Sequence, residues 1–209
     1  MDAFVKGLRK SGKISGIVHK KAISKQQIQK LFENGELGPA DTKDLAQHLL
    51  QRTAWFYLGF FFGRRGRENQ RDMKPGMLAL RMTPQGEEYF ELNREFPGAV
   101  PATKNHQGGL SDAEDESDAK IFPAPDHPRC PVKTIKNYLS HINPKLDALF
   151  QRPPEVRSLN PDEDKVLFCN APLGLNTLNT MMKSMSSRAG IQPHSDKSLP
   201  RGNISNSTI

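Results

Sequence analysis

The pattern of apolar positions predicts a first helix that begins at Ser24. Gln27 follows three residues later, which is the spacing of a capping box, and the next apolar residues share one helical face. Two glycines, Gly35 and Gly38, end the pattern. A second, longer helix is predicted over residues 42–62, amphipathic at first and then apolar on every side, as is typical of a helix through the middle of a domain.

The rest of the chain predicts a small sheet and two further helices. Strands at Met77–Thr83 and Glu87–Leu92 flank a turn-forming Pro-Gln-Gly tripeptide, so we expect a hairpin. Pro131 opens a third helix with one apolar face. A short strand at Val166–Cys169 and a Met-rich helix at Asn176–Arg188, closed by a glycine, complete the series.

This order of elements predicts an α+β domain, mainly helical, with one small antiparallel sheet. We expect three parts: a basic arm at residues 1–22, the domain core at 23–191 and a polar, disordered tail at 192–209. Within the core, residues 111–119 form an acidic stretch that suits a solvated loop. The longest apolar run, from Trp55 to Phe62, is far shorter than the roughly 20 residues of a membrane span, so no membrane partner is predicted.

The composition and charge of the chain indicate which class of partner it binds. The formal net charge is +7, and the isoelectric point is about 9.5, which favours a polyanion such as nucleic acid, although solubility alone can account for such an excess. The two cysteines, Cys130 and Cys169, lie far apart and in no metal-binding spacing, so we predict neither a zinc site nor a disulfide. Two reduced thiols are typical of an intracellular protein, and we expect that location. No cofactor is predicted.

Two clusters of cations could bind phosphate. Four arginines directly follow the most apolar helix, and the planar guanidinium group can bind two phosphate oxygens at once; they are Arg64, Arg65, Arg67 and Arg71. Lys104 and His106 lie in a glycine-ended turn after the hairpin. The alternatives are surface arginines paired with nearby acids and an ordinary surface turn.

Together these segments resemble a known family. Residues 60–73 resemble the first-arginine motif of tyrosine recombinases, most closely the Crypton-type recombinases and their relatives in animal genomes. The Thr103-Lys104 turn, the Pro128–Val132 segment that opens a helix with Tyr138-Leu139, and Pro172–Leu178 before a Met-rich helix are similar to other motifs of that family, in the same order. The resemblance covers roughly residues 23–191.

The resemblance implies DNA integration and recombination through a covalent phosphotyrosine intermediate, in which positioned cations stabilise the phosphate. By motif, Arg65 is the first catalytic arginine, with Arg64 as the alternative register, and Lys104 protonates the leaving oxygen. Contacts with the backbone of double-stranded DNA would come from six residues: Arg64, Arg65, Arg67, Arg71, Lys104 and His106.

The second half of the family's catalytic set departs from the pattern. Lys197 stands at the histidine position of the His-x-x-Arg motif, and Pro200 replaces or displaces the arginine, which makes Arg201 a doubtful match. The three tyrosines, Tyr57, Tyr89 and Tyr138, all lie upstream of the position of the family's nucleophile. We therefore expect a truncated, non-catalytic domain, whether through a real loss or an artefact of the gene model.

The leading hypothesis is a non-catalytic DNA-binding remnant of a recombinase. The alternatives are a recombinase completed by a tyrosine from another chain, a protein-interaction or regulatory domain that docks through the acidic loop, and a truncated gene product without function. A DNA partner implies a nuclear location, and otherwise a cytoplasmic one is expected. The DNA target, the oligomeric state and independent folding stay open.

Overall fold

The computed structural model describes residues 23–41, 47–62, 70–99, 119–154 and 166–191. In these ranges the chain forms α-helices and one antiparallel hairpin, an α+β arrangement as predicted: α2 (Lys25–Glu33), α3 (Gln47–Phe62), the 3-10 turn η1 (Pro75–Met77), β1 (Leu78–Met82), β2 (Glu88–Leu92), α5 (Pro131–His141) and α6 (Leu175–Arg188). The predicted basic arm, the tail and residues 111–118 of the acidic stretch lie outside the described residues, as do residues 42–46 of the predicted second helix.

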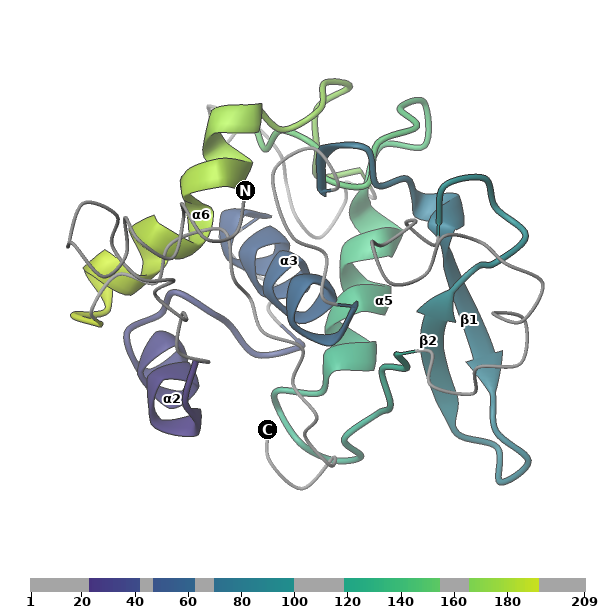
Figure 1. Cartoon of the computed structure of the whole chain (residues 1–209), viewed down its shortest axis with the longest axis horizontal. Coiled ribbons are helices and arrows are strands. Elements are labelled where there is room, and N and C mark those ends of the chain that lie inside the picture. Colours follow the sequence, from purple (N-terminus) through teal and green to yellow (C-terminus); the bar gives the residue numbers. More distant parts are fainter. Residues whose placement is uncertain (1–22, 42–46, 63–69, 100–118, 155–165, 192–209) are drawn as a thin grey trace, which may run out of the picture.

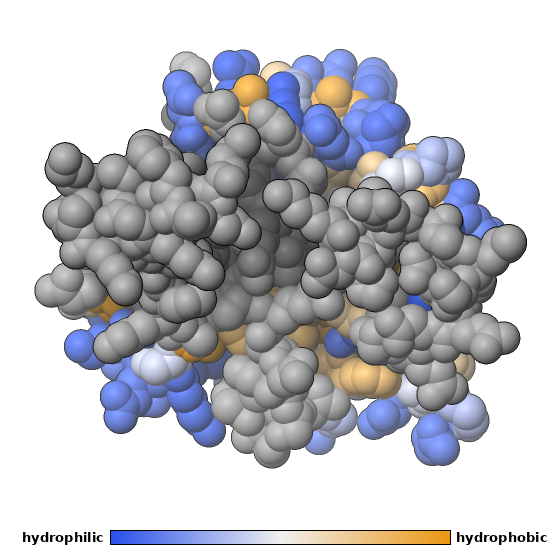
Figure 2. Space-filling model, in the orientation of Figure 1, coloured by the Kyte–Doolittle hydropathy of each residue, from blue (hydrophilic) through white to orange (hydrophobic). Residues whose placement is uncertain are grey.

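Helix α3 is the centre of the core. Eleven of its residues are buried, on all sides, because its neighbours surround it. It packs against α5, and α5 in turn contacts β2. Figure 1 shows α3 and α5 in the middle of the molecule, with the hairpin on one side and α2 and α6 on the other. In the same orientation, Figure 2 shows mostly hydrophilic described residues around the rim of the molecule.

The boundaries of the helices follow from local chemistry. The Ser24 side chain accepts a hydrogen bond from the Gln27 N–H, and the Gln27 side chain accepts one from the Ser24 N–H, which confirms the capping box. Helix α6 ends at Arg188, and Gly190, two residues later, has a φ of 63°, in the left-handed region that favours glycine. Its methionines 181, 182 and 185 are buried in the core, as predicted.

The hairpin is confirmed, with slightly shorter strands. Leu78 pairs with Leu92 and Met82 with Glu88, and Gly86 takes a positive φ of 86° in the turn. Met77 belongs to η1 and not to the strand. On the other side of β2, Phe90 forms an isolated bridge with Ile121, so the covered edge of the sheet is that of β2.

The predicted strand at residues 166–169 is wrong: these residues form no strand. Leu167 donates its N–H to the His141 carbonyl (2.9 Å) and Cys169 donates its N–H to the Arg152 carbonyl (2.9 Å), so the segment is tied by single bonds to two different places. The apolar run exists because Leu167 and Phe168 are buried, the latter with its ring 5.2 Å from that of Tyr138. A buried apolar segment does not have to be hydrogen-bonded to a neighbouring strand, so the apolar pattern predicted a strand that does not form.

None of the described helices is both long enough and apolar enough to span a membrane.

Candidate functional site

Most of the residues predicted to bind DNA lie outside the described ranges. This holds for Arg64, Arg65, Arg67, Lys104 and His106, and also for Arg201, the doubtful match to the second catalytic arginine. The structure describes Arg71, the last arginine of the cluster, and the residues that flank the cluster on either side. These residues define where the predicted site joins the fold.

Both ends of the arginine-bearing segment are fixed to the core. Before it, Phe62 is the buried last residue of α3. After it, the buried Gln70 accepts a hydrogen bond from the indole N–H of Trp55 (3.0 Å), two turns back in α3. Arg71 then donates from Nη1 to the carbonyl oxygen of Leu173, two residues before α6 begins. A guanidinium group has five N–H donors, so this contact leaves Arg71 capacity for a phosphate oxygen.

The contact between Arg71 and Leu173 joins two of the segments that carry the family resemblance, residues 60–73 and 172–178. A third segment, residues 128–139, is held against α3 by two tyrosines. The Tyr57 hydroxyl donates to the Arg129 carbonyl (2.7 Å), and the Tyr138 hydroxyl accepts from Gln51 Nε2 (3.3 Å). These bonds therefore link the described parts of the three resemblance segments to one another or to α3.

The tyrosines occupy structural positions. Tyr57 and Tyr138 are buried, and burial raises the pKa of each hydroxyl far above its usual value. The Tyr138 hydroxyl also donates to the Leu149 carbonyl (2.7 Å). Tyr89 lies on β2, with its ring centre 5.3 Å from that of Phe122 and the Lys120 ammonium 5.5 Å from its own centre.

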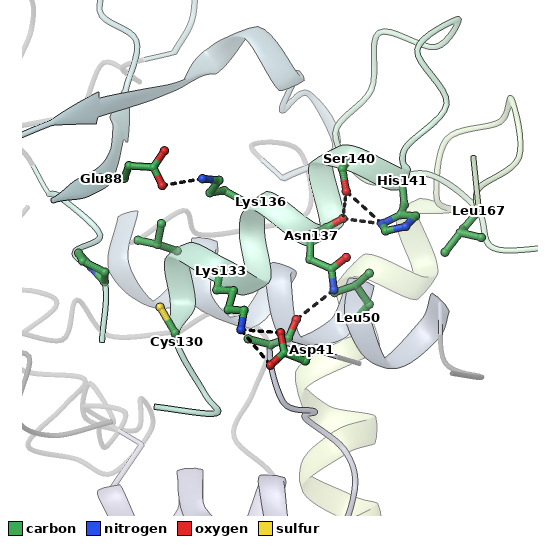
Figure 3. Close-up of a pocket in the computed structure, with 13 residues that line it drawn as sticks. Asp41, Leu50, Glu88, Cys130, Lys133, Lys136, Asn137, Ser140, His141 and Leu167 are labelled. Atoms are coloured by element: carbon green, nitrogen blue, oxygen red, sulfur yellow. Dashed lines mark hydrogen bonds and ion pairs between the residues drawn. The ribbon is translucent and has the colours of Figure 1, made fainter. Parts of the chain in front are cut away.

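A pocket of about 730 Å³ lies along the exposed face of α5 (Figure 3). Its apolar part comes from Leu50, Val132 and Leu167, and its polar part from residues one turn apart on α5. Asn137 donates from Nδ2 to the Ala40 carbonyl (3.0 Å), and Ser140 donates to the Asn137 carbonyl (2.8 Å). These contacts fix the shape of the pocket.

The lysines of this pocket are each paired with a carboxylate. Lys133 lies 2.7 Å from Asp41, whose carboxylate raises the pKa of the ammonium, and Lys136 lies 2.5 Å from Glu88. A phosphate would have to compete with these carboxylates, so the pocket is not a strongly cationic site. No three His, Cys, Asp or Glu side chains come together as a metal site anywhere in the described ranges.

A charged cluster that sequence reasoning missed joins the segment after α2 to α3 and α6. Glu36, with a side chain only 8% exposed, accepts two hydrogen bonds from Arg188 (2.6 and 2.7 Å) and lies 3.1 Å from Arg52. His48, one turn before Arg52, has a lowered pKa, first because it is partly buried and second because of the Arg52 charge. The pairing spans 152 residues of sequence, so no local signal could have found it.

A second missed feature is the buried amide of Gln151. Its Nε2 donates to the carbonyl oxygens of Asn143 (3.0 Å), Leu146 (3.3 Å) and Ala148 (3.1 Å), and its Oε1 accepts from the Asn143 N–H (2.6 Å). Gln51 in α3 donates to the Gln151 carbonyl. One side chain thus organises the loop after α5. The only signal in the sequence was a glutamine beside an apolar pair, Leu149-Phe150.

Comparison of the chain with protein-family models, curated proteins and solved structures gave no match. The resemblance to tyrosine recombinases therefore depends on the motifs in the sequence.

Proposed function

We propose that this chain is a duplex-DNA-binding module of the Crypton-type tyrosine recombinase kind that does not cleave DNA. The observation that carries the proposal is the contact between Arg71 and the Leu173 carbonyl, which ties the arginine motif to the segment before α6. Phe62 and Gln70, the described residues on either side of Arg64, Arg65 and Arg67, are both buried in the core, and Gln70 is held by Trp55. Because the residues that flank the arginine cluster are held in place, less entropy is lost when the arginines bind a phosphate.

The proposed binding mode is contact with backbone phosphates. Arg64, Arg65, Arg67 and Arg71, together with Lys104 and His106, would supply the cations, and the net charge of +7 would attract the duplex. Such contacts position a protein on DNA without reading its sequence. A nuclear location follows from this partner and is part of the proposal.

The absence of cleavage is proposed on chemical grounds. A recombinase of this type needs a tyrosine hydroxyl within reach of the phosphate and several cations acting together. The hydroxyls of Tyr57 and Tyr138 are buried and bonded to backbone carbonyls, which makes both unsuitable as nucleophiles. At the family's second motif the sequence carries Lys197 and Pro200 in place of histidine and arginine.

Fluorescence anisotropy of the purified chain with labelled duplexes of several sequences tests the proposal. We expect weak binding with little sequence preference and an affinity that falls steeply as salt is raised. Arg65→Ala and Lys104→Ala should each weaken binding more than Lys145→Ala, which removes one positive charge from an exposed position after α5. Circular dichroism on each variant checks that the fold is kept.

Two results would contradict the proposal. Equally negligible binding at low and moderate salt would leave the interaction-domain hypothesis ahead. Equal losses in all three variants would mean that net charge alone, and no defined site, attracts the DNA.

A further inference from the structure

One backbone edge of strand β1 faces away from β2, which is the only strand paired with β1 among the described residues. In an antiparallel pair, alternate residues point their N–H and C=O groups at the neighbouring strand. Two bonds that flank the paired residues show which residues of β1 face β2. Thr83 N–H donates to the Glu87 carbonyl (2.8 Å), and Asn93 N–H donates to the Met77 carbonyl (2.9 Å), so the odd-numbered residues of β1 point their backbone groups at β2. The outward-pointing residues of β1 are therefore Leu78, Leu80 and Met82.

The two edges of the sheet differ. On the far side of β2, Phe90 exchanges both backbone bonds with Ile121 (3.0 and 2.8 Å), so that edge is covered. On the β1 side, Leu78 uses its N–H in a turn bond to the Pro75 carbonyl. This leaves the Leu78 carbonyl and the backbone groups of Leu80 and Met82 directed outward. Figure 1 shows β1 on the side of β2 that faces away from α5.

The side chains along this edge are apolar and unusually exposed. Leu80 pairs with Phe90, so both lie on the face of the sheet that covers the core, yet Phe90 is buried and Leu80 is 42% exposed. Met82, two residues on and on the same face, is 66% exposed. A strand edge with free backbone groups and apolar side chains is a template for pairing with another strand.

We propose that this edge pairs with β1 of a second copy of the chain, antiparallel and with the two-fold axis at Leu80. Each Leu80 N–H then donates to the Leu80 carbonyl of the other copy, and each Met82 N–H donates to the Leu78 carbonyl of the other copy. The two hairpins become one continuous four-stranded sheet. The contact is isologous and closed, because the same patch serves both copies.

The side chains match in this register. Leu80 meets Leu80 of the other copy, and Leu78 meets Met82, so the core-facing side of the joint is wholly apolar. On the opposite side, Arg81 meets the small side chain of Ala79. An axis at Arg81 would set two arginines against each other, and an axis at Ala79 would leave Met82 without a partner. The strand is therefore complementary to itself about one residue.

Sedimentation of the full chain without DNA, from low to high micromolar concentration, tests this inference, which does not depend on the proposed function. We expect a monomer–dimer equilibrium in the unaltered chain. Leu80→Lys sets two like charges opposite each other on the axis and should give monomers throughout. Leu175→Lys is the matched control, because Leu175 on α6 is equally exposed, at 43%, and should leave the equilibrium unchanged.

A second pair of variants locates the contact. Leu80→Glu should also be monomeric by itself, and mixing it with Leu80→Lys should restore a dimer through opposite charges. Met82→Lys replaces a more exposed side chain and serves if Leu80→Lys fails to fold. An unaltered chain that stays monomeric at the highest concentration, a dimer that survives Leu80→Lys or Met82→Lys, or a mixture that stays monomeric would each overturn the inference.

Discussion

The hydroxyl of Tyr57 donates a hydrogen bond of 2.7 Å to the backbone carbonyl of Arg129, 72 residues further along the chain. The bond links the central helix α3 to the segment that leads into α5. It also gives Tyr57 a structural task, as do the bonds of Tyr138 to Leu149 and Gln51. Two of the chain's three tyrosines thus hold the core together.

Removing these hydroxyls should lower stability. Tyr57→Phe leaves the Arg129 carbonyl without its donor, and we expect a loss of about 1 kcal/mol in the free energy of unfolding. Tyr138→Phe should cost more, about 1–3 kcal/mol, because it leaves the Leu149 carbonyl without its donor in a fully buried place and also removes one of the two acceptors of the Gln51 amide. Urea denaturation measures both losses. A Tyr138→Phe variant as stable as the unaltered chain would contradict this reading of the core.

No covalent protein–DNA adduct should form with suicide duplex substrates on a denaturing gel. The reason is that groups that act as a unit lose most of the rate when one is missing. Tyr89→Phe is the decisive variant, because Tyr89 is less deeply buried than the other two tyrosines. An adduct that forms with the unaltered chain and disappears in Tyr89→Phe would make Tyr89 a nucleophile and the chain an enzyme.

The Glu36 cluster should stabilise the contact between α6 and the segment after α2. Glu36→Gln keeps the shape of the side chain but removes the charge that both arginines contact, and it should lower the free energy of unfolding by about 1–3 kcal/mol. Glu33→Gln is the matched control at an exposed position of α2 and should change stability by no more than about 0.5 kcal/mol. Equal effects of the two substitutions would show that the Glu36 cluster does not stabilise the fold.

His48 should make the fold less stable in mild acid. Its pKa is lowered in the folded chain from the ordinary value of 6.5, so the unfolded chain binds a proton first as the pH falls. The contribution of neutral His48 is therefore present above about pH 6.5 and is lost as the pH falls from there toward the lowered pKa. Urea denaturation from pH 7.5 to 5.5 should show a smaller loss of stability in His48→Gln than in the unaltered chain. Parallel curves for the two proteins would show that His48 has no such role.

Local patterns in the sequence determined the elements of this fold. The Ser24 capping box, the proline that opens α5, the Pro-Gln-Gly turn and Gly190 are signals within a few residues, and the structure places a helix or strand boundary at or within two residues of each. The all-round apolar character of residues 55–62 likewise identified the central helix. The strand predicted at Val166–Cys169 failed because an apolar run reports burial and does not specify the hydrogen-bond partners.

Only the tertiary structure decided which distant residues meet. Arg71 was predicted as a phosphate contact, and the fold adds its bond to the Leu173 carbonyl, 102 residues away. The Glu36–Arg188 pair and the side of the sheet on which β1 forms the edge were likewise not predictable from the sequence. The physical reason is that capping and periodicity act between residues in the same few turns of chain, whereas these contacts depend on how whole helices and strands pack. The sequence alone could propose the arginine cluster, and its anchors in the core became visible only once α3 and α6 were in place.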